Sequence, residues 1–264
     1  MHRSAPRLSR ILACAAVPVM LVVAGCSSDS GDAKDSGSGA SASASAKKTE
    51  PTVEPAKFAE LPDACSSSLG KKTIEDLVPK TKNKGGSPGT SSDTTSRGRC
   101  SWNGLDDNGV KGSQYRWLDV GYTRFDSDQS LGSGAERAKD EYTKQVAKAQ
   151  ATEGAEKTSA KPATGLGEQA TAVTYGLTKS KEDFEYATVV ARTGNVVVSV
   201  TYNGAGFAGA KTPSAADILK GAQKAAKEAV AAVVGASGDD TEKSSASPSA
   251  KASASSSAKT DDKS

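Results

Sequence analysis

The fold class follows from the stretch FEYATVVARTGNVVVSVTY, residues 184–202. Two runs rich in β-branched and aromatic residues flank Gly194-Asn195, which is a favourable two-residue hairpin turn. The stretch therefore predicts a pair of antiparallel strands, 184–192 and 196–202. Because side chains alternate between the two faces of a strand, one face of the second strand is expected in the core: Val196, Val198, Val200 and Tyr202.

The hydrophobic pattern predicts further elements on both sides of this hairpin. Strands are expected over 99–105, 115–125 and 170–176, with a long loop over 81–98 and a turn over 106–109. Helices are expected over 73–78, with Thr73 as the N-cap, over 135–149, and from Pro213 to Gly235. This order predicts an α+β fold in which an antiparallel sheet packs against helices in a single domain.

The composition of the two chain ends sets the expected boundaries of that domain. Residues 27–50 and 236–264 contain no Val, Ile, Leu, Met, Phe, Tyr or Trp, so they lack the apolar surface that offsets the entropy of ordering. We expect a disordered tether over 26–57, an ordered domain over 58–236 and a disordered low-complexity tail over 237–264.

The amino terminus has the features of an export signal, expected over 1–25. Three arginines precede an apolar run from Ile11 to Val23, which is shorter than a membrane span. The run ends in Val23-Ala24-Gly25-Cys26, which resembles a bacterial lipobox. Cleavage after Gly25 and lipidation of Cys26 would anchor the protein to the outer face of the cell membrane. The alternatives are an ordinary secretory signal with a chance cysteine, or an uncleaved anchor.

Charge and histidine content exclude several classes of function. The chain has 34 Lys and Arg against 31 Asp and Glu, and removal of the three signal arginines leaves the two signs equal. No basic cluster interleaved with aromatic residues appears, so no nucleic-acid partner is expected. The single histidine, His2, lies in the signal, which excludes a Ser-His-Asp or Cys-His nucleophile and a His-ligated metal. We expect no cofactor and no metal.

Two cysteines remain after the signal cysteine Cys14 and the lipobox cysteine Cys26 are set aside. Outside the membrane, Cys65 and Cys100 are expected to form a disulfide. The alternative is two free thiols or a redox pair, although their spacing is not that of a Cys-x-x-Cys motif.

Four aromatic side chains form the candidate binding surface. Tyr115, Trp117 and Phe125 would share one face of the strand 115–125, with Trp102 nearby. Such residues would line an apolar groove for a lipid, a glycan or a peptide. The alternative is that they pack beneath a helix. The opposite face of the strand is expected to carry Leu118, Val120 and Tyr122.

Motifs with catalytic precedent are weak, and no catalytic residue is assigned. The glycine motif at 165–170 lacks the preceding strand and following helix that a dinucleotide site needs. Ser68-Leu69-Gly70-Lys71 fits the S-x-x-K pattern of penicillin-recognising enzymes, but the helix that follows is short. The turn at 106–109 fails the EF-hand pattern, and the acid pair Glu182-Asp183 lies on an expected loop.

Several of these features occur together in a recognisable order. They are the lipobox, the tether, Leu61-Pro62-Asp63-Ala64-Cys65, Arg99-Cys100-Ser101-Trp102, the glycine motif at 165–170 and the closing Ala-rich helix. The chain resembles a family of actinobacterial secreted lipoproteins catalogued only as a domain of unknown function. The resemblance implies an extracytoplasmic α+β domain with one disulfide, and it supplies no catalytic residues.

The sequence thus predicts a lipid-anchored, non-enzymatic binding or sensor-like domain for an unidentified ligand or surface protein. One alternative is a small His-free hydrolase of cell-wall material. Another is an accessory subunit of a surface transporter or cell-wall complex.

Overall fold

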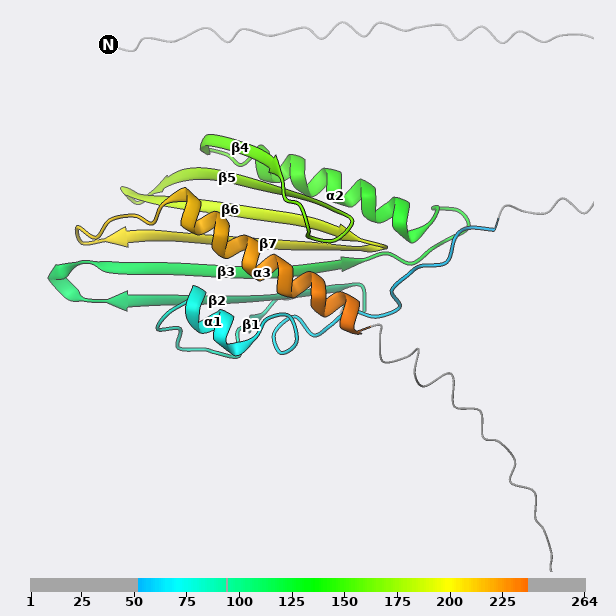
Figure 1. Cartoon of the computed structure of the whole chain (residues 1–264), viewed down its shortest axis with the longest axis horizontal. Coiled ribbons are helices and arrows are strands. Elements are labelled where there is room, and N and C mark those ends of the chain that lie inside the picture. Colours follow the sequence, from blue (N-terminus) through cyan, green and yellow to red (C-terminus); the bar gives the residue numbers. More distant parts are fainter. Residues whose placement is uncertain (1–51, 94, 237–264) are drawn as a thin grey trace, which may run out of the picture. The chain divides into compact units, whose positions relative to one another are not determined.

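The computed structural model describes residues 52–93 and 95–236 (Figure 1). The predicted signal peptide, Cys26, the tether up to residue 51 and the tail over 237–264 lie outside these residues. The described part is an antiparallel seven-stranded sheet with three α-helices, which confirms the predicted fold class. Among these described helices, none is both long and apolar enough to cross a membrane.

The elements follow one another along the chain as α1 (Lys71–Leu77), β1 (Ser87–Pro88), β2 (Arg97–Asp107), the short 3-10 helix η1 (Gly109–Lys111), β3 (Ser113–Arg124), α2 (Gly134–Gln150), β4 (Glu156–Pro162), β5 (Gln169–Lys179), β6 (Glu182–Thr193), β7 (Val196–Phe207) and α3 (Ala215–Ala236).

The β6–β7 hairpin lies at the middle of the sheet, whose strand order is β1-β2-β3-β7-β6-β5-β4. Gly194 occupies the turn with a φ of 52°, a left-handed conformation that glycine adopts without strain. β3 pairs with β7 along its whole length, from Ser113 opposite Phe207 to Arg124 opposite Val196. The predicted hairpin is therefore confirmed, and it forms the seam to which both halves of the sheet are attached.

The turn predicted over 106–109 is placed too early. Asp106 and Asp107 are residues typical of turns, but they remain in β2, opposite Gln114 and Ser113. The chain reverses at η1 instead. The Asp107 carboxylate accepts hydrogen bonds from the amide of Gly109 and from the hydroxyl of Ser113, so it closes the hairpin from the end of the strand.

Strand β4 was not predicted. Its sequence, EKTSAKP, lacks large apolar residues, and nearly all of its side chains are exposed at the edge of the sheet. The strand is held by backbone pairing with β5. Hydrophobic periodicity gives no signal for a strand that buries no face.

Thr73 is not the N-cap of the first helix, because α1 begins at Lys71 and contains it. The Thr73 hydroxyl donates to Glu228 Oε1 of α3 at 2.6 Å, and the Gly70 amide donates to Oε2 of the same carboxylate at 3.0 Å. A carboxylate from a distant helix thus satisfies the amino end of α1. This tertiary cap is invisible to a local reading of the sequence.

The main core lies between one sheet face and α3, which crosses that face in Figure 1. Gly221 approaches the ring of Tyr202 so closely that a Cβ atom there would lie 2.6 Å from the ring. The helix presents mostly small side chains to the sheet, which allows close packing. The predicted core face of β7 is confirmed, and the predicted face of β3 joins the same cluster: Leu118, Val120 and Tyr122.

The disulfide between Cys65 and Cys100 is present, with the two Cα atoms 5.1 Å apart. It joins the segment before α1 to the middle of β2, and Cys100 is fully buried. The predicted pairing is therefore confirmed.

Asn195 fastens the entering chain to the end of the sheet. Its buried side chain accepts a hydrogen bond from the amide of Phe58 at 2.8 Å, and it donates to the carbonyl oxygens of Phe58 at 2.9 Å and Phe125 at 2.8 Å. We call this set of three bonds the Asn195 clamp. Contacts with the domain begin before residue 58, since the Ser127 hydroxyl donates to the carbonyl oxygen of Glu54 and Lys57 forms an ion pair with Glu168.

Candidate functional site

The second face of the sheet is only partly covered. Ser133 and Glu136 form a capping box that starts α2. From there the helix packs Ala138 and Tyr142 against Val190 and Val197 of the β6–β7 hairpin. The helix does not extend over β2 and most of β3. The outward side chains of β2 are therefore mostly exposed.

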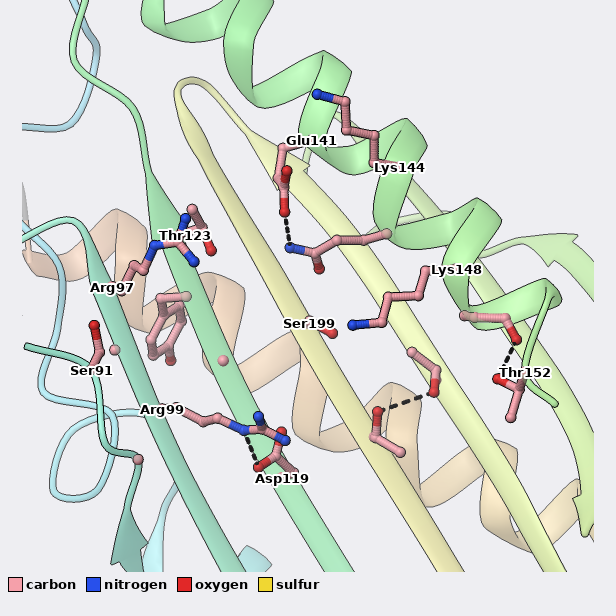
Figure 2. Close-up of a pocket in the computed structure, with 18 of the residues that line it drawn as sticks. Ser91, Arg97, Arg99, Asp119, Thr123, Glu141, Lys144, Lys148, Thr152 and Ser199 are labelled. Atoms are coloured by element: carbon pink, nitrogen blue, oxygen red, sulfur yellow. Dashed lines mark hydrogen bonds and ion pairs between the residues drawn. The ribbon is translucent and has the colours of Figure 1, made fainter. Parts of the chain in front are cut away.

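A groove of about 830 Å³ lies between α2 and the β2–β3 side of this face. Figure 2 shows Arg97 and Arg99 of β2 on one side and Lys144 and Lys148 of α2 on the other. The floor consists of small or hydroxyl-bearing residues: Gly121, Thr188, Ser199 and Thr201. Small floor residues leave open volume above the sheet where a typical core would place apolar side chains.

Asp119 is the most buried charged group lining this groove. Its side chain is 10% exposed, and its carboxylate forms an ion pair with the Arg99 guanidinium at 2.8 Å. Burial raises the pKa of Asp119, and the neighbouring Arg99 offsets this rise only in part. On the floor, the hydroxyls of Thr188 and Thr201 bond to each other at 3.0 Å.

Two of the four predicted surface aromatics lie elsewhere. Trp102 is 1% exposed and belongs to the main core, opposite Leu118, on the face away from Trp117. The expectation that it lies near the other three aromatics is wrong, because its position in β2 points it to the α3 side. Phe125 packs at the edge of the α2 cluster, beyond the last residue of β3.

Tyr115 and Trp117 do come together, in a pocket of about 390 Å³. We call it the aromatic pocket; its lining is Tyr115, Trp117, Lys179, Phe184, Tyr186, Asn203 and Phe207. Tyr115, Phe184 and Phe207 form three ring pairs with centroids 6.0–6.1 Å apart, and two of these pairs meet edge to face. Such pairs fix ring positions, so the wall is built before any ligand arrives.

Lys179 completes one side of the aromatic pocket. Its ammonium lies 5.0 Å from the centre of the Tyr186 ring and donates a hydrogen bond to the Tyr186 hydroxyl at 2.9 Å. The Tyr186 ring in turn stacks on Tyr175, with centroids 5.1 Å apart. Burial in this pocket, with a smaller effect of the neighbouring Tyr186, raises the pKa of Tyr115 above its ordinary value.

Asn203 is the unusual member of this pocket. Its side chain is 3% exposed, and its Oδ1 atom is buried without a hydrogen-bond partner among the described residues. An unsatisfied buried polar group costs about 1–3 kcal/mol of stability. An apolar residue of similar shape would avoid that cost, so the amide is a candidate ligand-contacting group.

The groove and the aromatic pocket are neighbours on one face. Asp119 lies opposite Thr201 in the groove, and two residues along the strands Trp117 lies opposite Asn203 in the pocket. Because residues two apart share a face, the two cavities follow each other along β3 and β7.

The sequence analysis missed Phe184, Tyr186, Asn203 and Phe207. The signal was present in the hairpin stretch itself. Once Tyr202 is assigned to the core, alternation places Asn203 on the other face, and the antiparallel register then brings Tyr186 beside it. The register between β3 and β7 could not be predicted from the sequence, because more than seventy residues separate the two strands.

The S-x-x-K residues do not form an open site. Ser68 is 1% exposed, and its hydroxyl donates to the carbonyl oxygen of Ala64, whereas Lys71 is exposed at the start of α1. Ser68 therefore acts as a buried structural hydroxyl in this fold.

No protein-family model matches the chain, and no curated protein matches it. Among solved structures, the chain has a distant likeness to the crystal structure of LpqN, a protein described as involved in cell envelope biogenesis of Mycobacterium tuberculosis. The match has 14% identity and a TM-score of 0.28, and it covers 54% of this chain and 87% of LpqN. At this similarity the match carries no argument about function, and the resemblance to the lipoprotein family rests on the sequence motifs.

Proposed function

We propose that this chain is a lipid-anchored extracytoplasmic binding domain that acts without catalysis. The observation that carries the proposal is the uncovered sheet face, where a groove with a small-residue floor continues into a preformed aromatic pocket. A pocket with aromatic walls and few polar groups is typical of ligand-binding sites.

The location is supported by two independent features. The disulfide between Cys65 and Cys100 is typical of proteins outside the cytoplasm. The lipobox ending at Cys26 gives a means of attachment in the same compartment. The family resemblance is consistent with both.

The non-catalytic part of the proposal is supported by the partners of two of the three carboxylates that line the groove. Asp119 is committed to Arg99, and the Glu141 carboxylate accepts a hydrogen bond from Gln145 on the same helix. A general acid or base needs a proton-transfer partner at the substrate, and these groups already hold partners within the protein.

Anchoring is tested by exporting the full chain from an actinobacterial host. The wild-type protein is expected in the membrane fraction, with a mass increased by acyl chains, and Cys26→Ser is expected in the medium. A Cys26→Ser protein that stays in the membrane would contradict lipid anchoring.

Binding is tested by native mass spectrometry of the secreted Cys26→Ser chain. We expect an additional bound mass that is lost in a Trp117→Ala background and kept in the matched control Asn103→Ala, which is exposed beside Trp117. A bound mass that survives Trp117→Ala would place the ligand elsewhere. Turnover of cell-wall material by the purified Cys26→Ser chain would contradict the non-catalytic part of the proposal and favour the hydrolase.

A further inference from the structure

The aromatic pocket contains one feature that an apolar ligand would leave unexplained. Five aromatic residues form its wall, yet the buried Oδ1 of Asn203 has no partner among the described residues. An acyl chain filling the pocket would leave that atom without a hydrogen-bond partner. The ligand that suits the pocket must therefore offer both an apolar face and a hydrogen-bonding group.

We propose that the aromatic pocket binds the ring of a saccharide; this inference rests on the binding function proposed above. A sugar ring has a face of C–H groups that stacks on aromatic side chains, and hydroxyls around its rim. A hydroxyl donates to the Oδ1 of Asn203 or accepts from the Nδ2 of the same amide, so it satisfies the group in either orientation.

Other ligand classes fit the pocket less well. A cationic ligand would meet Lys179, whose ammonium already occupies the position near the face of Tyr186. The pocket has a volume of about 390 Å³, near the lower end of the roughly 300–1,000 Å³ typical of ligand sites. A long acyl chain would need more room than this. One or two sugar rings suit this volume, and the adjoining groove has space for further hydroxyl-bearing units.

The chain provides a matched pair of asparagines for the test. Asn103 and Asn203 lie opposite Trp117 on its two neighbouring strands, but Asn103 is exposed whereas Asn203 is buried. Asn203→Leu removes the unpartnered amide and keeps the approximate shape of the side chain. Asn103→Leu makes the same chemical change outside the aromatic pocket.

The experiment is a fluorescence titration of the secreted Cys26→Ser chain with glucose, mannose, galactose, arabinose, N-acetylglucosamine and their disaccharides. Trp117 is half-buried in the pocket and reports binding, while Trp102 is buried in the core. We expect at least one sugar to bind, with similar affinity in Asn103→Leu and about tenfold weaker in Asn203→Leu. Because the unsatisfied amide is gone, Asn203→Leu is expected to melt at the same temperature as the parent or higher.

Several results would overturn the inference. These are no binding by any sugar, equal binding by Asn203→Leu, or a lower melting temperature of Asn203→Leu, which would show a structural role. Tighter binding of lauric acid than of every sugar would assign the pocket to an acyl chain. A co-purified non-saccharide ligand that depends on Trp117 would overturn this inference and leave the binding function standing.

One further experiment distinguishes a cell-wall polymer from a soluble saccharide as the source of the sugar. Co-sedimentation with isolated cell-wall polysaccharide, competed by the free sugar, would identify a polymer as the source. Binding of the free sugar without co-sedimentation would identify a soluble saccharide.

Discussion

The Asn195 clamp gives the most quantitative prediction. Asn195→Ala removes three hydrogen bonds, two buried ones to the backbone of Phe58 and a partly buried one to that of Phe125. At about 0.5–1.5 kcal/mol for each bond, the free energy of unfolding is expected to fall by roughly 3 kcal/mol. For a domain of this size, that loss lowers the melting temperature by roughly 6–12 °C.

The assay is urea unfolding followed by tryptophan fluorescence, together with a thermal melt by circular dichroism. The exposed Asn103→Ala is the control, and it is expected to change stability by less than about 0.5 kcal/mol. A truncated chain that begins at Ala59 lacks the partner residue Phe58. It therefore loses two of the hydrogen bonds that Asn195→Ala also removes, together with their contribution to the free energy of unfolding. The double variant should therefore lose less than the sum of the two single losses. A loss below about 1 kcal/mol, or full additivity with the truncation, would refute the reasoning.

Three further predictions concern stability. The double variant Cys65→Ser, Cys100→Ser opens a loop with a sequence separation of 35, and its free energy of unfolding is expected to fall by roughly 4 kcal/mol, measured by urea unfolding without reductant. Burial raises the pKa of Asp119 in the fold, so its contribution to stability is full below its unfolded pKa and is lost as the pH rises through its folded pKa. Asp119→Asn should therefore be at least as stable as wild type at pH 7, and its stability relative to wild type should rise between pH 3 and pH 7. Equal slopes for the two proteins would count against this assignment. Glu228→Ala removes the tertiary cap of α1 and is expected to cost about 1–2 kcal/mol in the same urea assay, whereas the exposed Glu153→Ala should change little.

Much of the fold was predictable because its strongest signals are local. The β6–β7 hairpin has a turn dipeptide and alternating valines, and α3 has a clear apolar stripe that begins after Ser214, whose hydroxyl accepts from the amide of Asp217. The capping box of α2 is likewise written in the sequence. These elements form wherever local preference and burial agree.

The failures share a different cause, which is dependence on distant residues. β4 is a strand only because β5 offers it backbone partners, and the start of α1 depends on Glu228. Trp102 was grouped with Trp117 because both are aromatic and near in sequence. The pairing of β2 with β3 places them on opposite faces, since Trp102 lies opposite Leu118 rather than Trp117.

Two of the seven residues that line the aromatic pocket were predictable in the same way. Tyr115 and Trp117 stood out as aromatic residues on one strand face, but their partners in the aromatic pocket come from β5, β6 and β7. Asn203 gave no signal as a residue type, because an asparagine at a strand position usually indicates a turn or a solvated edge. Only its burial without a partner distinguishes it.

The Asn195 clamp also sets the end of the sheet at which the amino-terminal part of the chain enters the domain. The clamp lies where β3 ends and β7 begins, whereas Tyr115 and Phe207 lie at the other end of the same two strands. Phe125 lies eight positions after Trp117, just beyond the end of β3, and eight steps of extended chain span roughly 26 Å. The chain thus enters the sheet at the clamp, and the aromatic pocket lies toward the opposite ends of β3 and β7, away from the connection to the amino-terminal segment.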